Sequence, residues 1–400
     1  MSEGLYDSRT LNPVSILFDR LFHPNADMLS NDQSVIEWKH SPENEVRHLV
    51  LGLGQPGGSW HHMTNTQLTV SLVKWLQLPG YSFKEWYAEN ETKAANLPKV
   101  AHVPGVHPGR TNALYVGLYY ADYVKQMGLS GNFVNNARVT NVVQCGGNSS
   151  QWLVEGVQYN DHLEPEPFSV RSDNVALACG AFNIPRTLGI TGEDYSFVHH
   201  KLADVDLDTL TTHKCPVLVV GCGLVALDSV LSLMARKIQV IHVFRRSAKD
   251  PELIINQLSS AYADYLKLKG LMQNKGACND YYLPFPQHTL SEILPNKNVV
   301  VEHINRKVRF KLHVSKAIIN IGLMPDLSFI ANYEELKEEP LEEFHIKNNP
   351  LDIDLHTHEC RSRKGLYALG PLVGDNFVRF ISGGALAVTH GLFRNQNCEK

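Results

Sequence analysis

Apolar and polar positions along the chain predict strands that alternate with helices, which is typical of an α/β protein. The clearest pattern is a β-branched apolar run at residues 216–220, followed by a glycine pair and then by a helix-compatible stretch. A second strand-like run at residues 238–244 completes a strand–helix–strand unit. Residues 217–235 carry Asp228 as their only charge and are long enough to span a membrane. Because a lone membrane helix would need no second strand, the pattern favours this unit over a membrane span or a plain buried helix.

Other segments of the chain also show helical or strand-like periodicity. Residues 13–22 predict a short helix that begins near a proline, and residues 112–127 predict an amphipathic helix that stops at Gly128. Residues 250–272 are helical in pattern, and residues 383–387 open an apolar helix near the end of the chain. Further strands are expected at residues 47–52, 133–144, 151–158, 168–170, 174–180, 298–303, 317–322 and 365–370. The strands expected between residues 133 and 170 should pair antiparallel with one another, as an excursion from the main α/β pattern.

The glycine turn of the central unit has the spacing that binds a dinucleotide. Gly221 allows the tight turn, Gly223 lets a pyrophosphate approach the backbone, and the small Ala226 lets the helix pack closely on the strand. The phosphates would lie at the helix N-terminus, where free N–H groups favour anions. The second strand ends in Arg245-Arg246, where an NAD-binding unit usually carries an acid. Two guanidiniums suit a 2′-phosphate, so NADPH is expected rather than NADH, and a solvated basic turn is the alternative.

Composition narrows the class of protein. The chain has 400 residues with 43% hydrophobic content, which is enough for two domains with sizeable cores. A formal net charge of −4 offers no basic field, so nucleic acid is not an expected partner. The seven cysteines are scattered and form no C-x-x-C pair, which favours a reducing compartment over a zinc site or a disulfide framework. No secretory signal is visible, so a cytoplasmic location is expected, with the nucleus as the alternative.

Two further glycine-containing motifs are candidates for cofactor binding. Gly57-Gly58-Ser59-Trp60 allows close backbone approach and offers a flat aromatic face, although an ordinary loop with an anchoring tryptophan is the alternative. The tail repeats the order of strand, glycine and helix in Gly365 to Gly370, Gly374-Asp375 and Gly383-Gly384-Ala385. The acidic run at residues 334–343 lacks regular ligand spacing, so it is interpreted as a solvated loop and no metal is expected.

Five motifs in this order resemble the flavin monooxygenases that have two dinucleotide-binding domains. They are Gly57-Gly58-Ser59-Trp60, Ala178-Cys179-Gly180, Gly221-Cys222-Gly223-Leu224-Val225-Ala226, Ile321-Gly322-Leu323-Met324-Pro325-Asp326 and Gly365-Leu366-Tyr367-Ala368-Leu369-Gly370. The resemblance implies an α/β fold in which a Rossmann-like NADPH domain is inserted into an FAD domain. The expected divisions are a lead-in at residues 1–45, FAD-domain parts at 46–205 and 313–400, and the NADPH domain at 213–312.

Nearly the whole chain is similar to the oxidative stress-induced growth inhibitor family, and within it to the second paralogue. The motifs that carry this similarity are Trp38-Lys39-His40, Gly57-Gly58-Ser59-Trp60-His61, Phe182-Asn183-Ile184-Pro185-Arg186, Asn256-Gln257-Leu258 and the stretch from Gly370 to Phe380. The family resemblance implies regulation of cell growth and differentiation, with roles in germ-cell maturation and meiosis, and an NADPH- and FAD-dependent monooxygenase activity. The cofactor-binding residues that the motifs and the resemblance together suggest are Gly57, Gly58, Trp60, Gly221, Gly223, Ala226, Arg245, Arg246, Gly370, Asp375, Gly383 and Gly384.

The microbial amine N-hydroxylases suggest which residues would lie nearest a substrate. Their helix-borne substrate lysine falls at Lys74, their Val-His-Ser linker resembles the sequence around His199, and their active-site asparagine falls at Asn256. Each has a structural alternative, namely a solvated helix lysine, a hydrogen-bonded linker histidine and a helix N-cap. The departures are Thr69 in place of a flavin-contacting glutamine, Cys179 in place of the threonine of Ala-Thr-Gly, and Pro371 in place of the aspartate of the flavin Gly-Asp motif.

The resemblance also implies a strand and a G-x-G-x-x-G turn that bind the FAD pyrophosphate, and no such unit precedes Arg47. Loss of that strand from the middle of a parallel sheet would leave unpaired edges and an incomplete flavin site. We therefore expect a shortened isoform or a fragment.

The resemblance implies that NADPH reduces FAD, that O₂ reacts with the reduced flavin, and that a dry pocket protects the product until a substrate, such as a small amine, takes one oxygen. Two other functions stay open. One is an inactive NADP(H)-binding scaffold that regulates growth through protein partners, which the missing turn and Pro371 favour. The other is a flavin-free NADPH dehydrogenase, which would leave the motif at residues 57–60 without a role.

Overall fold

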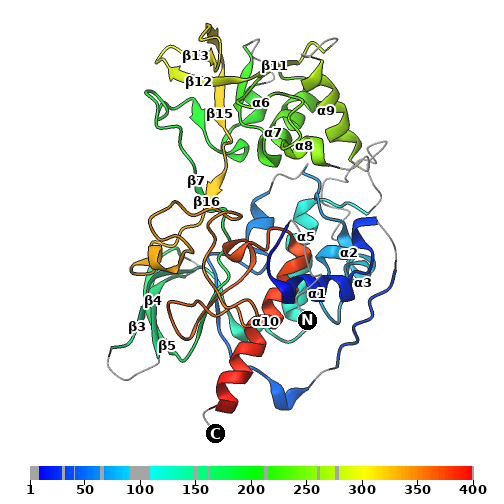
Figure 1. Cartoon of the computed structure of the whole chain (residues 1–400), viewed down its shortest axis with the longest axis vertical. Coiled ribbons are helices and arrows are strands. Elements are labelled where there is room, and N and C mark those ends of the chain that lie inside the picture. Colours follow the sequence, from blue (N-terminus) through cyan, green and yellow to red (C-terminus); the bar gives the residue numbers. More distant parts are fainter. Residues whose placement is uncertain are drawn as a thin grey trace.

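Two regions joined by a narrow pair of strands make up the fold in the computed structural model (Figure 1). The structure describes residues 9–28, 32–39, 41–63, 67–90, 109–146, 151–160, 162–210, 215–258, 262–274 and 279–398. We call the part from β8 to β15 the upper region, and the parts from α1 to β6 and from β17 to α10 the lower region. Between them, β7 (Ile184–Pro185) pairs antiparallel with β16 (Leu323–Met324), and we call this pair the neck.

The upper region is built on a five-stranded parallel sheet. Its order is β11 (Tyr282–Pro286), β10 (Val240–Phe244), β9 (Val217–Val220), β15 (Lys316–Ile319) and β8 (Val198–His199). Alternate side chains of β9 enter different cores. Val217 and Val219 pack beneath the helices α7 (Leu224–Ala235) and α9 (Ala263–Gln273), whereas Leu218 and Val220 face the antiparallel sheet of β12 to β14. The run at residues 216–220 is apolar throughout because both of its faces are covered.

Several predicted elements of the upper region are confirmed, with one difference. The central unit forms as predicted, since α7 begins directly after the glycine turn and β10 follows it. The antiparallel sheet has the order β12 (His288–Ile293), β13 (Asn298–His303) and β14 (Arg309–His313). The single helix expected at residues 250–272 is wrong, because Leu258 adopts an extended backbone and ends α8 (Ile254–Gln257) before α9 begins. Strands β8 and β15, which complete the five-stranded parallel sheet, lie on either side of residues 213–312.

The lower region holds one antiparallel sheet and two separate pairs of parallel strands. Strands β3 (Ala137–Gln144), β4 (Trp152–Tyr159) and β5 (Pro165–Ser172) form the predicted antiparallel excursion. One parallel pair is β1 (Val50–Leu51) with β2 (Phe133–Val134), and the other is β6 (Val175–Leu177) with β17 (Leu366–Ala368). No strand joins these two pairs within the described residues.

Helices surround these strands in the lower region. The predicted helix at residues 13–22 is confirmed as α1 (Pro13–Phe22), and it packs along α10 (Val378–Cys398). Helix α5 (Ala113–Gln126) begins where Asn112 Oδ1 accepts a hydrogen bond from Leu114 N at 2.9 Å. It shares an aromatic core with α3 (Phe83–Glu89), near α2 (Val73–Leu76). The other helices on this side of the neck are short: η1 (Ala26–Met28), η2 (Pro42–Asn44), η3 (Gly58–His62), η4 (Ser130–Asn132), η6 (Tyr333–Leu336) and η7 (Gly370–Val373). The upper region holds two further short helices, η5 (Leu202–Asp204) and α6 (Leu207–Leu210).

The last helix begins earlier than the sequence predicted. Helix α10 starts at Val378, so Gly383 and Gly384 lie inside it and do not open it. The glycine at position 383 is explained by helix packing, because a Cβ atom there would lie 2.5 Å from Ser15 Cα of α1. The glycine therefore marks a close helix crossing. Of the helices that the structure describes, none is both long and apolar enough to cross a membrane.

Candidate functional site

The glycine turn after β9 is shaped by contact with the neighbouring strand. Gly221 has a φ of 124°, and a Cβ atom there would lie 2.1 Å from the carbonyl oxygen of Asn320. Gly223 is the N-cap residue of α7, and no atom lies within 4 Å of the position that its Cβ would take. Ala226, in the first turn of α7, is fully buried, and its Cβ would lie 3.4 Å from a Cβ atom at Gly221. The first glycine is thus required by the fold, whereas the second leaves open space at a helix N-terminus, where an anion can bind.

A buried histidine holds this turn from the adjacent strand. His242 Nε2 lies 2.6 Å from the carbonyl oxygen of Gly221, and its Nδ1 lies 2.8 Å from the hydroxyl of Tyr282. Burial lowers the pKa of His242 to about 4, so the ring is neutral at physiological pH. Nε2–H then donates to Gly221, and the Tyr282 hydroxyl donates to Nδ1. Sequence reasoning missed His242, although a single imidazole within the apolar run of residues 240–244 was a signal.

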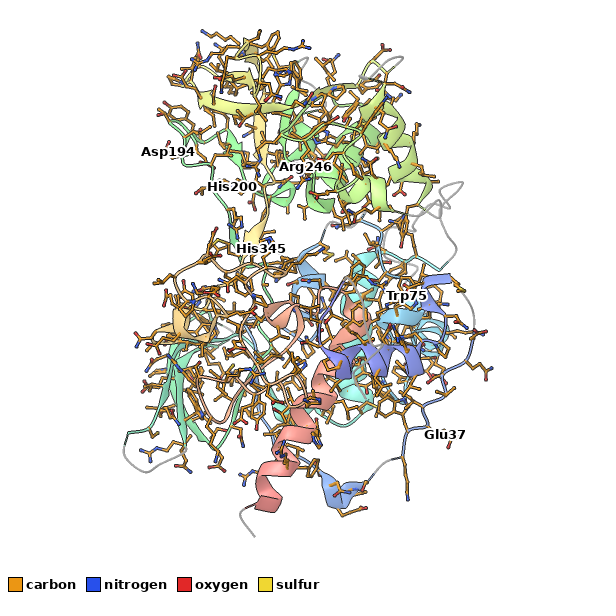
Figure 2. The ribbon with its side chains drawn as sticks, in the orientation of Figure 1. Glu37, Trp75, Asp194, His200, Arg246 and His345 are labelled. Carbon is orange, nitrogen blue, oxygen red and sulfur yellow. The ribbon has the colours of Figure 1, made fainter. Side chains whose placement is uncertain are left out.

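The two arginines after β10 lie beside the turn. Arg246 is paired with Asp250 at 3.1 Å and with Glu252, while Arg245 is exposed and has no hydrogen bond or ion pair within the described part of the chain. Burial raises the pKa of the Cys222 thiol in the turn, and the guanidiniums of both arginines oppose that effect. Both charges therefore act on the site where phosphates would bind. Figure 2 shows Arg246 in the upper region and Trp75 in the lower one.

Lys74 lies on α2 in the lower region. Its carbonyl oxygen accepts a hydrogen bond from His23 Nε2 at 3.1 Å, and burial lowers the pKa of its ammonium group. The next residue, Trp75, lies under the guanidinium of Arg379, whose Cζ is 5.2 Å from the ring centre. Helix α2 is thereby fixed to both α1 and α10.

His199 and Asn256 belong to the upper region. His199 Nε2 accepts from Lys316 Nζ at 3.2 Å, and its pKa is lowered by burial and then by the Lys316 charge. Asn256 Nδ2 donates to the carbonyl oxygens of Ala248 and Asp250, at 3.1 and 2.7 Å. Among the described residues, no hydrogen bond or ion pair links Lys74, His199 and Asn256 to one another.

The glycine–tryptophan motif follows β1 in the lower region. Gly57 has a φ of 107°, and a Cβ atom there would lie 2.8 Å from the carbonyl oxygen of Gly117 in α5. Gly58 and Trp60 belong to η3, which packs on that helix. Sequence reasoning missed that Gly52, Gly54 and Gly57 also fit the G-x-G-x-x-G spacing. That turn leads into the five-residue η3, which offers no extended helix N-terminus to a pyrophosphate.

Asp375 is buried beneath the N-terminal segment of the chain. Its carboxylate accepts hydrogen bonds from Thr10 Oγ1 at 2.5 Å, Asn12 Nδ2 at 2.8 Å and Ser15 Oγ at 2.8 Å. Burial raises the pKa of Asp375 to about 6 in spite of these three donors. Its backbone N–H donates to the carbonyl oxygen of Gly370 at 3.1 Å. The carboxylate is thus committed to the first turn of α1 and the residues just before it.

The close packing of α10 involves the second glycine of its pair. A Cβ atom at Gly384 would lie 3.1 Å from Asp375 Oδ2 and 3.2 Å from His358 Cε1. His358 is completely buried, and burial lowers its pKa to about 4, so the ring is neutral. Gly384 therefore lies against two buried polar groups.

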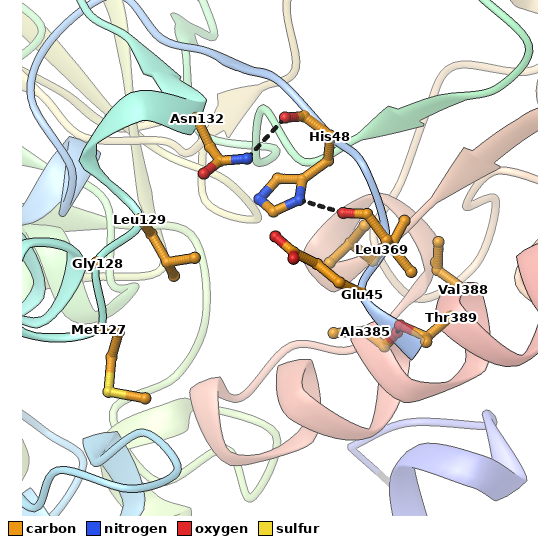
Figure 3. Close-up of a pocket in the computed structure, with 11 residues that line it drawn as sticks. Glu45, His48, Met127, Gly128, Leu129, Asn132, Leu369, Ala385, Val388 and Thr389 are labelled. Carbon is orange, nitrogen blue, oxygen red and sulfur yellow. Dashed lines mark hydrogen bonds between the residues drawn. The ribbon is translucent and has the colours of Figure 1, made fainter. Parts of the chain in front are cut away.

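A cavity of about 610 Å³ lies between the end of α5 and the face of α10 (Figure 3). Its polar rim includes Glu45, His48 and Asn132, and Asn132 Nδ2 donates to the carbonyl oxygen of His48 at 3.0 Å. Its apolar lining is formed by Met127, Leu129, Leu369, Ala385 and Val388. His48 precedes β1, Asn132 precedes β2 and Leu369 follows β17, so the cavity borders both parallel pairs. None of the cofactor or substrate residues expected from the sequence lines it.

Comparison with known sequences finds relatives along almost the whole chain. The chain is 36% identical over 418 residues to oxidative stress-induced growth inhibitor 1 of Homo sapiens, covering 99% of this chain and 84% of that protein. It is 37% identical over 432 residues to oxidative stress-induced growth inhibitor 2 of Homo sapiens, covering 99% and 83%. These nearly equal identities do not favour either paralogue. No protein-family model matches the chain.

Solved structures with low sequence identity share the fold. A bacillithiol disulfide reductase of Bacillus cereus has a TM-score of 0.63 at 14% identity, covering 87% of this chain and 92% of that one. The ornithine hydroxylase of Pseudomonas aeruginosa has a TM-score of 0.60 at 12% identity, also covering 87% and 92%. A thioredoxin reductase of Lactococcus lactis has a TM-score of 0.55 at 16% identity, covering 86% and 89%. The predicted fold of a flavoprotein with two dinucleotide-binding domains is therefore confirmed.

Proposed function

The chain belongs to the oxidative stress-induced growth inhibitor family, and on that premise we propose that it is an NADPH-binding flavoprotein relative that regulates cell growth. The glycine turn is the observation that carries the proposal. Gly223 leaves open space at the N-terminus of α7, so a pyrophosphate can approach its N–H groups. Exposed Arg245 lies beside the turn and offers a charge to a 2′-phosphate.

The residues around the turn fit NADPH, which supplies a hydride when bound. His242 fixes the carbonyl of Gly221, so the turn keeps its shape without a ligand. Arg246 is held by Asp250 and Glu252, and Asn256 in turn binds the carbonyl oxygen of Asp250. The coenzyme would meet a preformed cradle, which lowers the cost of ordering on binding.

We propose FAD as the second cofactor, and that this chain alone holds it weakly. The parallel strands of the lower region form two unjoined pairs, and the turn at residues 52–57 leads only into the short η3. Asp375 is engaged by Thr10, Asn12 and Ser15. These residues do not assemble a complete pyrophosphate cradle, so we derive no chemical step through the flavin.

For a family member with a complete flavin site, we propose an NADPH- and FAD-dependent monooxygenase that uses O₂ on a small amine or another small molecule. Lys74, His199 and Asn256 are the proposed residues nearest the substrate. Its proposed setting is the cytoplasm, with the nucleus as the alternative, and its proposed role extends to differentiation, germ-cell maturation and meiosis. The family relationship supports the growth-regulating part of this proposal.

A second candidate function is a catalytically inactive NADP(H)-binding scaffold that acts through protein partners. Two observations favour it for this chain, namely the unjoined parallel pairs and the commitment of the Asn256 amide to backbone carbonyls. Both functions share the NADPH site, so they differ in flavin content and turnover.

The deciding experiment combines a visible spectrum, an NADPH titration and an oxidation assay on the purified chain. We expect NADPH binding, little bound flavin and slow NADPH oxidation with added FAD. A matched protein, extended at its N-terminus by a strand and a G-x-G-x-x-G turn, should retain flavin. Stoichiometric FAD with full turnover in the 400-residue chain would refute weak flavin binding, and failure to bind NADPH would refute both candidate functions.

A further inference from the structure

A buried arginine connects the lower region to the upper region, away from the neck. Arg110 belongs to the lower region, and its side chain is 1% exposed. Its Nε donates to the carbonyl oxygen of Thr69 at 2.6 Å, and its Nη1 lies 3.1 and 3.3 Å from the carboxylate oxygens of Asp264 in α9. Its Cζ lies 5.1 Å from the ring centre of Tyr262 and 5.8 Å from that of Tyr265. One guanidinium therefore binds the backbone of one region and a carboxylate and two rings of the other.

Three more hydrogen bonds surround this arginine at the same contact. Gln67 Nε2 donates to Asp228 Oδ2 at 3.1 Å, and the hydroxyl of Tyr265 donates to the other oxygen of Asp228. The hydroxyl of Tyr262 donates to the carbonyl oxygen of Val70 at 2.8 Å. We call these residues of the two regions the latch. Gln67 and Val70 come from the lower region, whereas Asp228 lies on α7, Tyr265 on α9 and Tyr262 at the N-cap of α9.

The latch joins the two elements that matter most to the proposed function. Asp228 lies on α7, the helix whose N-terminus carries Gly223 of the dinucleotide turn. Residues 67–70 lead into α2, which carries Lys74. The two regions are also connected by the neck, whose strands have two residues each. Such a short pair offers little resistance to rotation of one region against the other.

We propose that Arg110 is a positioning residue, which locks the NADPH-binding turn of the upper region at a fixed orientation to the Lys74 helix of the lower region. The latch is inferred from contacts between the regions, and only its consequence for hydride transfer rests on the proposed function. Because the guanidinium is buried and makes bonds in several directions, its loss leaves Asp264 and the Thr69 carbonyl without their partner.

The latch also responds to pH through Asp228. Burial raises the pKa of Asp228 to about 6, while the Tyr265 hydrogen bond, the Arg110 charge and the Gln67 hydrogen bond lower it and the Asp264 charge raises it. Opening the latch would hydrate this carboxyl and return its pKa toward 3.8. The closed latch therefore binds a proton more tightly, so the contribution of Asp228 to closure is complete below pH 3.8 and is lost as pH rises through about 6.

The test measures the distance between spin labels on the two regions of the full chain, without cofactors. Exposed Glu37 of the lower region and exposed Arg306 of the upper region can be replaced by a noncanonical residue that carries the label, which avoids the native cysteines. We expect one narrow distance distribution for the otherwise unchanged protein. Arg110→Ala should add a second, broad population and shift the ratio of open to closed molecules at least tenfold.

Matched variants separate positioning from general damage. Arg110→Lys keeps a charge for Asp264 but loses the planar contact with the tyrosines, so it should restore part of the narrow population. Arg309→Ala removes an exposed ion pair with Glu302 inside the upper region, at 2.8 Å, and should leave the distribution unchanged. Asp228→Asn should keep the narrow distribution and abolish its response between pH 3.8 and about 6, the interval between the two pKa values of Asp228.

An unchanged distribution in Arg110→Ala would overturn the proposal. If that variant does not fold, Asp264→Asn takes its place, and the same narrow distribution there would overturn it equally. An NADPH titration of each variant is read separately. If the latch opens and NADPH binding is unaltered, Arg110 positions the regions and does not contribute to coenzyme affinity. If no protein binds NADPH, the proposed function is rejected, whereas the conclusion from the distance measurement still holds.

Discussion

Two alanine substitutions in the glycine turn should separate stability from coenzyme binding. Gly223→Ala should weaken NADPH binding and leave stability nearly unchanged, whereas Gly221→Ala should lower stability. Gly223 has φ −76° and ψ 172°, which alanine adopts readily, and no atom lies within 4 Å of the added Cβ. The free energy of unfolding should therefore change by less than about 1 kcal/mol, since alanine is a slightly poorer N-cap but restricts the unfolded chain. The same methyl group would stand where the pyrophosphate approaches.

The expected loss of binding follows from the contacts that the methyl group prevents. Displacing the pyrophosphate from one or two N–H groups removes charge-assisted hydrogen bonds of about 1.5–3 kcal/mol each. The Kd for NADPH should rise at least about tenfold for each 1.4 kcal/mol lost. Gly223→Ala should thus be a stable protein that binds NADPH weakly.

Gly221→Ala should instead lose stability. Its φ of 124° lies in a region that costs a residue with a Cβ about 1–3 kcal/mol. The added Cβ would also meet the carbonyl oxygen of Asn320 at 2.1 Å, and relieving such overpacking costs about 1–3 kcal/mol more. The sum, about 2–6 kcal/mol, is a large part of the typical stability of a protein, about 5–15 kcal/mol.

Urea unfolding and a fluorescence titration with NADPH measure the two effects on the same samples. The reasoning is refuted if Gly223→Ala binds NADPH like the unchanged protein, or if it loses as much stability as Gly221→Ala. The second outcome would mean that the space beside Gly223 is needed by the fold and is not kept for a ligand.

Three further predictions concern charge, pH and packing. Arg245→Ala should weaken the binding of NADPH more than the binding of NADH. It should also weaken NADPH binding more than Arg246→Ala does, because two acids already hold Arg246. Equal losses of affinity for both coenzymes in titrations would contradict this prediction. Burial raises the pKa of Asp375 from 3.8 to about 6, so its contribution to stability is complete below pH 3.8 and is lost as pH rises through 6. Asp375→Asn should accordingly be most destabilised, relative to the unchanged protein, in unfolding at pH 4–5, and a constant difference up to pH 7.5 would argue against it. Gly383→Ala should cost about 1–3 kcal/mol in urea unfolding, since its Cβ would meet the backbone of Ser15 at 2.5 Å, and an unchanged midpoint would be inconsistent with that contact.

The parts of the fold that the sequence predicts best are those whose signal is local. Strands β9 and β10 are buried on both faces, so each is an unbroken apolar run, and the glycine turn lies within the same stretch of sequence. Helix α1 and strand β13 were likewise predicted with the bounds that the structure shows. The start of α10 was missed because Gly383 and Gly384 read as a helix start, whereas they serve contacts with distant segments.

The parts that sequence reasoning could not predict depend on contacts between distant residues. Arg110 and Asp264 are separated by 154 positions, and Gln67 and Asp228 by 161. No periodicity or spacing links such pairs, because each residue occupies an ordinary position in its own segment. His242 differs in that its imidazole within an apolar strand is a visible anomaly, but its partner, the Gly221 carbonyl, follows only from the parallel pairing of β9 and β10.

Asp375 shows how a residue can be identified by its motif while its contacts come from elsewhere. The tail glycines suggested a cofactor-facing carboxylate, and nothing in the sequence pattern linked the helix at residues 13–22 to the site. In the structure, Thr10 and Asn12 before that helix and Ser15 in its first turn supply the three side-chain donors to Asp375, and Gly383 lets the helix pack against α10. A flavin that needed the Asp375 carboxylate would have to displace these donors and leave polar groups buried without partners, which costs about 1–3 kcal/mol for each group. If flavin does use the Asp375 carboxylate, docking of the N-terminal segment would compete with flavin retention, and Thr10→Val or Ser15→Ala should then raise the flavin content of the purified chain.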